Sequence, residues 1–182
     1  MWSFTLNQSE NAIINIGEIP VGDDVEDHGF WPWIRVYGPQ GALIGGGSRH
    51  GNLVAQVAFS APLTGTYTVV VASADSGYNA VGDYDLRLAR MPGGFVVPTG
   101  DQGGSMANGA TYPGRIGIGD LDMWSFTACA GSPLVVTINE VPVGPGVPDP
   151  GFWPWIRLYN PAGALVPGGS QYGNTLAQVS TR

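Results

Sequence analysis

The sequence has no lysine, a single cysteine and few charged residues. Its 7 basic side chains are all arginine, and charged residues make up 12% of the 182 residues, about half the usual share. The formal net charge of −7 argues against a nucleic acid or an anionic membrane surface as partner. No apolar run is long enough for a membrane-spanning helix, so we expect no membrane insertion. Cys129 alone cannot form an intrachain disulfide.

The sequence contains an internal repeat. Residues 29–35, Gly-Phe-Trp-Pro-Trp-Ile-Arg, recur unchanged at 151–157, a shift of 151 − 29 = 122 positions. Residues 1–5, Met-Trp-Ser-Phe-Thr, recur in the same way at 123–127. Residues 61–122 occur once. The chain therefore contains one and a half periods of a repeat of about 122 residues, a usual size for one domain.

Strand signals fill this repeat, and no segment carries the 3.6-residue apolar period of a helix. The 29 glycines and 15 prolines lie between short segments that alternate apolar and polar residues or are rich in β-branched ones. This pattern predicts an all-β fold of tandem antiparallel β-sandwich units with a jelly-roll-like arrangement. The expected strands are 2–6, 12–19, 32–37, 42–44, 52–59, 65–74, 83–91 and 115–118. The residues expected to fill the cores include Trp2, Phe4, Trp124 and Phe126.

The repeat also sets the expected boundaries. We predict a first sandwich unit at 1–91 that lacks its first strand, a Gly/Pro-rich linker at 92–112, and a second unit at 113–182 that lacks its last two strands. Met1 aligns with Met123 in mid-chain, so we expect either a segment of a longer tandem protein or a start that was assigned within a repeat. Proteins avoid exposed sheet edges, so we expect a neighbouring chain or an adjoining repeat to complete each unit.

Two groups of motifs resemble a known family. Residues 120–127, Asp-Leu-Asp-Met-Trp-Ser-Phe-Thr, and then residues 155–163 resemble the opening of a bacterial pre-peptidase C-terminal domain. Residues 61–71 and 82–88 are similar to the last two strands of that domain. The resemblance implies a jelly-roll-like sandwich on secreted bacterial proteins, outside the cell or at its surface. It also implies an accessory role in binding, spacing or secretion.

The two copies provide an internal control for catalysis. His28 and His50 align with Pro150 and Tyr172, and Cys129 has no cysteine counterpart, so no histidine or thiol recurs. The sequence has no Gly-x-Ser-x-Gly elbow, no His-Glu-x-x-His motif and no phosphate-binding glycine loop. We therefore predict that the protein is not an enzyme.

Aromatic residues and arginine gather at the repeated motif. Strand alternation places Trp33, Arg35 and Tyr37 on one face, with Trp31 at the loop edge. Such a face can pack within the fold, or it can form a contact between units or chains, where Trp, Tyr and Arg are enriched. It can also stack on the sugar rings of a glycan. The counterparts in the second copy are Trp153, Trp155, Arg157 and Tyr159.

Carboxylates supply the hard oxygen ligands that calcium prefers. Asp120 and Asp122 lie at the entrance of an expected strand, and Asp83 and Asp85 lie within another. A Ca²⁺ ion bound by these four residues is one interpretation, and we predict no other cofactor. The acidic loop 22–29 keeps only one acidic counterpart in the second copy, which favours a solvated loop. Its acidic residues are Asp23, Asp24, Glu26 and Asp27.

Two functions fit these features best, and an enzyme with an unrecognised site is a third interpretation. The first is a non-enzymatic structural repeat protein of a secreted bacterial fibre, adhesin or surface layer, whose units self-associate or run in series as a filament. The alternative is a carbohydrate- or polymer-binding accessory module of a secreted hydrolase. A continuous filament would favour the first function, and an isolated soluble monomer would favour the second.

Overall fold

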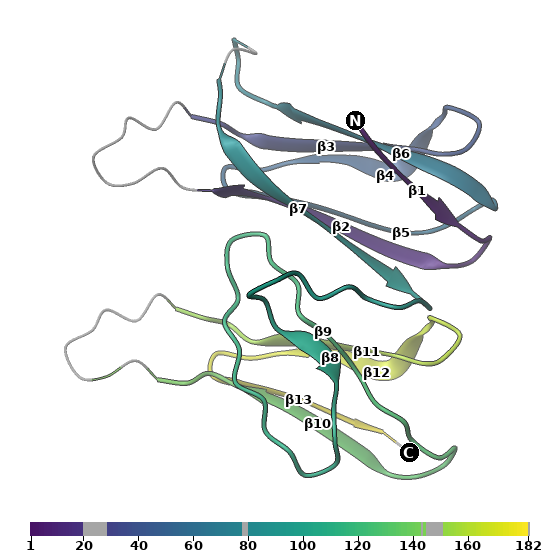
Figure 1. Cartoon of the computed structure of the whole chain (residues 1–182), viewed down its shortest axis with the longest axis vertical. Helices are drawn as coiled ribbons and strands as arrows, with labels where there is room; N and C mark the ends of the chain where they lie inside the picture. Colours follow the sequence, from purple (N-terminus) through teal and green to yellow (C-terminus); the bar gives the residue numbers. More distant parts are fainter. Residues whose placement is uncertain (20–28, 78–79, 143, 145–150, 182) are drawn as a thin grey trace. The chain divides into compact units, whose positions relative to one another are not determined.

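The computed structural model describes residues 1–19, 29–77, 80–142, 144 and 151–181 (Figure 1). The described residues form thirteen strands and no helix, so the fold is all-β, and its sheets are antiparallel apart from one parallel strand pair. The prediction of an all-β fold is therefore confirmed. No helix of the described residues has the length and apolar character needed to cross a membrane. The chain divides into two compact units, Met1–Ser125 and Phe126–Arg182.

The first sheet of unit 1 has the strand order β1-β6-β3-β4. β-branched residues in β6 favour an extended strand, and β6 pairs antiparallel with both β1 and β3. The bounds are β1 (Trp2–Leu6), β3 (Pro32–Tyr37), β4 (Leu43–His50) and β6 (Gly65–Ser73).

The second sheet of unit 1 has the strand order β5-β2-β7, with antiparallel pairing on both sides of β2. The bounds are β2 (Asn11–Ile19), β5 (Val54–Ser60) and β7 (Asp83–Met91). Both sheets of unit 1 contribute side chains to one buried cluster. Its members include Leu6, Ile34, Val36, Tyr67 and Val69 from the first sheet and Ala12, Ile14, Ile16, Ala55 and Val57 from the second.

Tyr67 in β6 is the largest fully buried side chain of this core. Its ring centroid lies 5.9 Å from that of Phe4 and 5.4 Å from that of Phe59. Its hydroxyl donates a hydrogen bond of 2.6 Å to the Leu63 carbonyl oxygen. A buried phenol thus keeps its polar group satisfied while its ring fills the space between the aromatic side chains.

Strand β2 is buried on both faces. Ile14 and Ile16 point into the core, while Ile13 and Asn15 on the opposite face are 6% and 4% exposed. At Gly17 the backbone of Ile118 and Gly119 comes so close that a Cβ atom would collide with it. A glycine is needed at this position because another part of the backbone passes directly over the strand.

Replacing Gly17 by alanine should therefore displace the segment that carries Ile118. We expect a loss of about 1–3 kcal/mol in the free energy of unfolding, the usual cost of overpacking, measured by urea denaturation. Gly45→Ala is the matched control, because no atom lies within 4 Å of its Cβ position, and its effect should stay within about 0.5 kcal/mol. Equal losses in the two variants would contradict the close packing at Gly17.

The described residues of unit 2 form two antiparallel strand pairs. The first pair is β10 (Leu134–Asn139) with β13 (Leu176–Thr181), and the second is β11 (Trp155–Tyr159) with β12 (Leu165–Tyr172). The register of both pairs matches that of β2 with β5 and of β3 with β4, shifted by 122 positions. The two remaining strands, β8 (Gly103–Ser105) and β9 (Met123–Ser125), pair in parallel and belong to unit 1.

Several local predictions differ from the structure. Residues 115–118 form no strand. Trp2 is 56% exposed and Phe126 is 36% exposed, so the prediction that both fill a core is wrong. The compact units divide after Ser125 rather than at a linker of residues 92–112. The physical reason is that residues beyond β7 are held in unit 1 by the packing at Gly17 and by ion pairs to β7.

Candidate functional site

The predicted aromatic and arginine residues form the same stacked pair in both units. In β3 the guanidinium carbon of Arg35 lies 3.6 Å from the ring centroid of Trp33, whose indole N–H donates to the Ser48 hydroxyl at 2.9 Å. In β11 the corresponding distances are 3.5 Å for Arg157 on Trp155 and 3.0 Å to the hydroxyl of Ser170. The arginine covers one ring face in each unit, and each cation–π contact is worth about 0.5–1 kcal/mol at an exposed site.

The other predicted aromatic residues lie around these pairs. Trp31 is 44% exposed, Trp153 is 64% exposed and Trp155 is 51% exposed. Tyr37 and Tyr159 are half-buried at the ends of their strands. Several indole rings thus stay accessible to a partner, whether a protein surface or a sugar ring.

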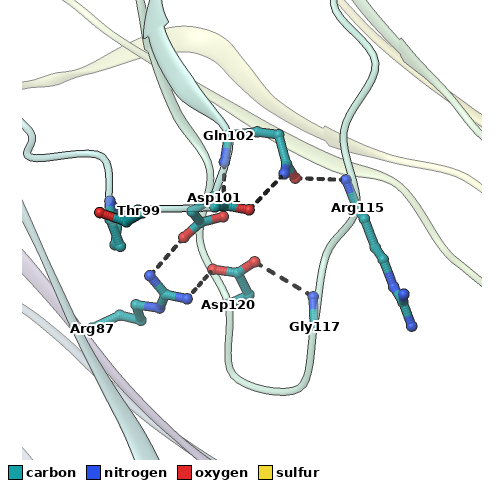
Figure 2. A pocket seen from close by; sticks show the side chains of 9 residues that line it. Arg87, Thr99, Asp101, Gln102, Arg115, Gly117 and Asp120 are labelled. Atoms are coloured by element: carbon teal, nitrogen blue, oxygen red, sulfur yellow. Dashed lines mark hydrogen bonds and ion pairs between the residues drawn. The ribbon is translucent and has the colours of Figure 1, made fainter.

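An arginine and three carboxylates form a charged cluster in the described part of unit 1, here called the Arg87 cluster (Figure 2). Arg87 projects from β7 and pairs with Asp101 at 2.6 Å and with Asp120 at 3.3 Å. Both aspartate side chains are only 8% exposed, and the arginine side chain is 19% exposed. One oxygen from each of Asp101, Asp120 and Asp122 lies within 4.8 Å of the others.

Backbone hydrogen bonds orient the two paired carboxylates. Asp101 accepts from the N–H of Gln102 at 2.9 Å, and Asp120 accepts from the N–H of Leu121 at 2.8 Å. The cluster lies beside an open pocket of about 340 Å³, and Figure 2 shows Arg87 reaching toward both carboxylates from one side. Because Arg87 is on β7 and its partners follow β7 in sequence, these contacts fasten the later segment to the second sheet.

Asp122 is the carboxyl group of the Arg87 cluster whose pKa is raised. Burial, followed by the charges of Asp120 and Asp101 and a hydrogen bond with Asp101, raises the pKa of Asp122 to about 6, against an opposing effect of Arg87. One oxygen of the Asp122 carboxyl group is shielded from solvent without a hydrogen-bond partner. Three carboxylates and one guanidinium leave excess negative charge, and a proton on Asp122 relieves it.

The raised pKa of Asp122 determines whether the stability of the folded chain rises or falls with pH. The folded chain keeps a proton on Asp122 that the unfolded chain releases, so stability should fall as the pH rises from about 4 to about 6. Asp122→Asn should remove this loss and should raise stability at pH 7 by about 1 kcal/mol, a figure reduced for partial exposure. Thermal unfolding at pH 4, 5 and 7 measures it. Asp83→Asn, at an exposed site of β7, is the control. An unchanged pH slope in Asp122→Asn would contradict the assignment.

The structure groups the predicted calcium residues differently from the prediction. Asp120 and Asp122 come together, but Asp101 rather than Asp83 or Asp85 completes the set of adjacent carboxylates. Asp83 and Asp85 are exposed on β7. Calcium binding stays a prediction, and the guanidinium of Arg87 already pairs with two of the three carboxylates. The acidic loop with Asp23, Asp24, Glu26 and Asp27 lies outside the described residues.

Sequence reasoning missed Arg87 and Asp101. Arg87 lies on the same strand face as Asp83 and Asp85, and this alternation is the sequence feature from which Arg87 could have been predicted as a site residue. Asp101 stands in a Gly/Pro-rich segment that was interpreted as a linker, where nothing in the local sequence indicates a buried ion pair.

Two strands of unit 2 have one sheet neighbour where their counterparts have two. In unit 1, β2 pairs with β5 and β7, and β3 pairs with β4 and β6. Among the described residues, β10 pairs with β13 alone and β11 pairs with β12 alone. Each therefore presents one long edge that no described strand occupies, a template for a further strand.

No family model matches this chain, and neither a curated protein nor a solved structure was found to be similar to it.

Proposed function

We propose that this chain is a non-enzymatic structural repeat segment in which jelly-roll-like β-sandwich units are joined in series. It would serve a secreted bacterial fibre, adhesin or surface layer, a location that rests on the resemblance to the pre-peptidase C-terminal domain. The observation that carries the proposal is the pair of strand edges on β10 and β11, whose counterparts in unit 1 are both paired. A strand that joins such an edge satisfies its N–H and C=O groups.

Exposed apolar side chains in unit 2 support the same proposal. Val135 is 61% exposed, Leu176 is 51% exposed and Tyr172 is 75% exposed. Removing apolar surface from water is worth about 25 cal/mol per Å². A contact between one open edge and a different surface does not close on itself, so it propagates as a series rather than a closed dimer.

The test is the molar mass of the 182-residue chain by sedimentation across a range of concentrations. We expect association and binding of a hydrophobic dye. Ile138→Asp, at the position of the core residue Ile16, should weaken association. Gln171→Asp, at a position that is exposed in both units because its counterpart is Arg49, should leave association unchanged. A cooperatively folding monomer at every concentration, without dye binding, would contradict the proposal.

Glycan binding is a second candidate, favoured by the exposed rings of Trp153 and Trp31. It predicts that the chain is retained on an insoluble polysaccharide and that Trp153→Ala releases it. Trp33→Ala is a useful comparison, because one face of that ring is covered by Arg35. Retention that is unchanged in both variants would argue against aromatic stacking.

A further inference from the structure

The core positions of two strands in unit 2 are less buried than the equivalent positions in unit 1. Ala177 and Val179 of β13 are 2% and 1% exposed, as deeply buried as their counterparts in β5. The core positions of β10 and β11 are instead half-buried, although their counterparts in β2 and β3 are at most 1% exposed. The residues concerned are Val136, Ile138, Ile156 and Leu158, which correspond to Ile14, Ile16, Ile34 and Val36.

Unit 1 shows what lies beside these positions when the core is full. Strand β7 places Leu88 opposite Ile14 and Leu86 opposite Ile16. Strand β6 likewise places Val71 opposite Ile34 and Val69 opposite Val36. Among the core positions of these strands, burial is thus lost in β10 and β11, whose counterparts pair with β7 and β6, and is kept in β13.

We infer, on the basis of the function proposed above, that the edges of β10 and β11 bind a strand pair with the sequence pattern of residues 65–91. Its first strand adds to β11 and its second strand adds to β10, both antiparallel. The register follows from unit 1, with a Val71 equivalent opposite Ile156 and a Leu86 equivalent opposite Ile138.

The occupant is a strand pair from an adjoining repeat rather than β6 and β7 of a folded second copy. In a folded copy, β6 and β7 are already paired with other strands of unit 1. Tyr67 of β6 is fully buried in the core of that unit. Transfer of β6 and β7 to a neighbouring copy would expose the core of the unit that they leave while it fills the core of the unit that they join. In the alignment of the two copies, Arg182 is equivalent to Ser60, which directly precedes residues 61–91 in unit 1.

The aromatic residues of the core add a requirement for the occupant. Tyr67 packs against Phe4 and Phe59, and the counterpart of Phe4 is Phe126, which is 36% exposed. The counterpart of Phe59 is Thr181. A tyrosine brought by the incoming strand at the position of Tyr67 would therefore meet a smaller neighbour, Thr181, at the position of Phe59.

The experiment extends the 182-residue chain by a second copy of residues 61–91 placed directly after Arg182. Hydrogen–deuterium exchange is followed in the segments that contain β10 and β11. We expect exchange in both strands to slow by at least about tenfold, together with loss of dye binding. The matched control carries Val69→Asp and Val71→Asp in the appended copy alone, which keeps its length and places charge on its core face.

The outcomes separate the two proposals. Protection by the extension and not by the control supports the inference. If the original chain associates but neither extension protects β10 and β11, the inference is wrong and the proposed function stands. If the original chain is a monomer at every concentration, the proposed function fails, and protection by the extension still decides the inference. Faster exchange of β6 and β7 in the associated original chain would instead show exchange between folded copies, which also overturns the inference.

Discussion

Replacing Arg87 by methionine should lower the free energy of unfolding at pH 7 by about 3–5 kcal/mol. The side chain neutralises Asp101 and Asp120, each 8% exposed. Methionine has a similar volume but no charge, so it leaves carboxylates buried without a counter-ion. The loss should shrink toward acidic pH, where carboxylates take up protons. Chemical denaturation at pH 4 and pH 7 measures both effects.

Two further variants test the cause of this loss. Arg90→Met, on the same strand, removes a hydrogen bond to the Thr5 carbonyl and should cost about 1 kcal/mol. Adding Asp101→Asn to Arg87→Met should recover part of the stability, because one uncompensated charge is then gone. Full additivity of the two substitutions, or a loss that does not depend on pH, would show that packing rather than charge pairing dominates at Arg87.

Tyr67→Ala should destabilise unit 1 by about 3–5 kcal/mol, the usual range for removing a buried aromatic ring. The ring is fully buried and contacts Phe4 and Phe59. Tyr67→Phe should cost about 1–2 kcal/mol, because it removes only the hydroxyl that bonds to the Leu63 carbonyl.

The control for Tyr67 is Tyr172→Ala, at a position that is 75% exposed, with an expected change within about 0.5 kcal/mol. Differential scanning calorimetry of the three variants gives the comparison. A loss below about 1 kcal/mol for Tyr67→Ala would mean that the aromatic cluster does not hold the two sheets of unit 1 together.

The sequence predicted the strands well where side-chain pattern alone decides the structure. Residues 83–91 were predicted as a strand, and β7 has the same bounds. Alternation fixes which residues share a face, and the core positions Ile34 and Val36 follow from it. The prediction for Trp2 was wrong because the same alternation cannot tell whether another strand covers that end of the sheet.

Glycine caused a different error. Residues 42–44 were predicted as a short strand that ends at the Gly-Gly-Gly run, since glycine marks turns. The strand instead continues as β4 (Leu43–His50), with a register shift opposite β3 between Arg35 and Tyr37. Gly46 has a φ of +70°, which lets the strand bulge and continue.

The Arg87 cluster was beyond sequence reasoning for a geometric reason. Asp101 and Asp120 lie 14 and 33 positions after Arg87, within a segment that has few regular strands. Nothing in a Gly/Pro-rich sequence specifies the path that returns it to the sheet. By contrast, the stacked pair of Trp33 and Arg35 follows from their separation by two positions on one strand.

The identical Met-Trp-Ser-Phe-Thr segments have a consequence for how the chain folds. The first forms β1 and pairs antiparallel with β6, whereas the second forms β9 and pairs in parallel with β8. Because the two segments are identical, either copy can pair with β6 while the chain is still unfolded, and mispairing of this kind is typical of repeat proteins. The residue that follows each segment distinguishes them, because Leu6 is 1% exposed and its counterpart is Ala128. Burial of the Leu6 side chain therefore favours pairing of the first copy, and not the second, with β6.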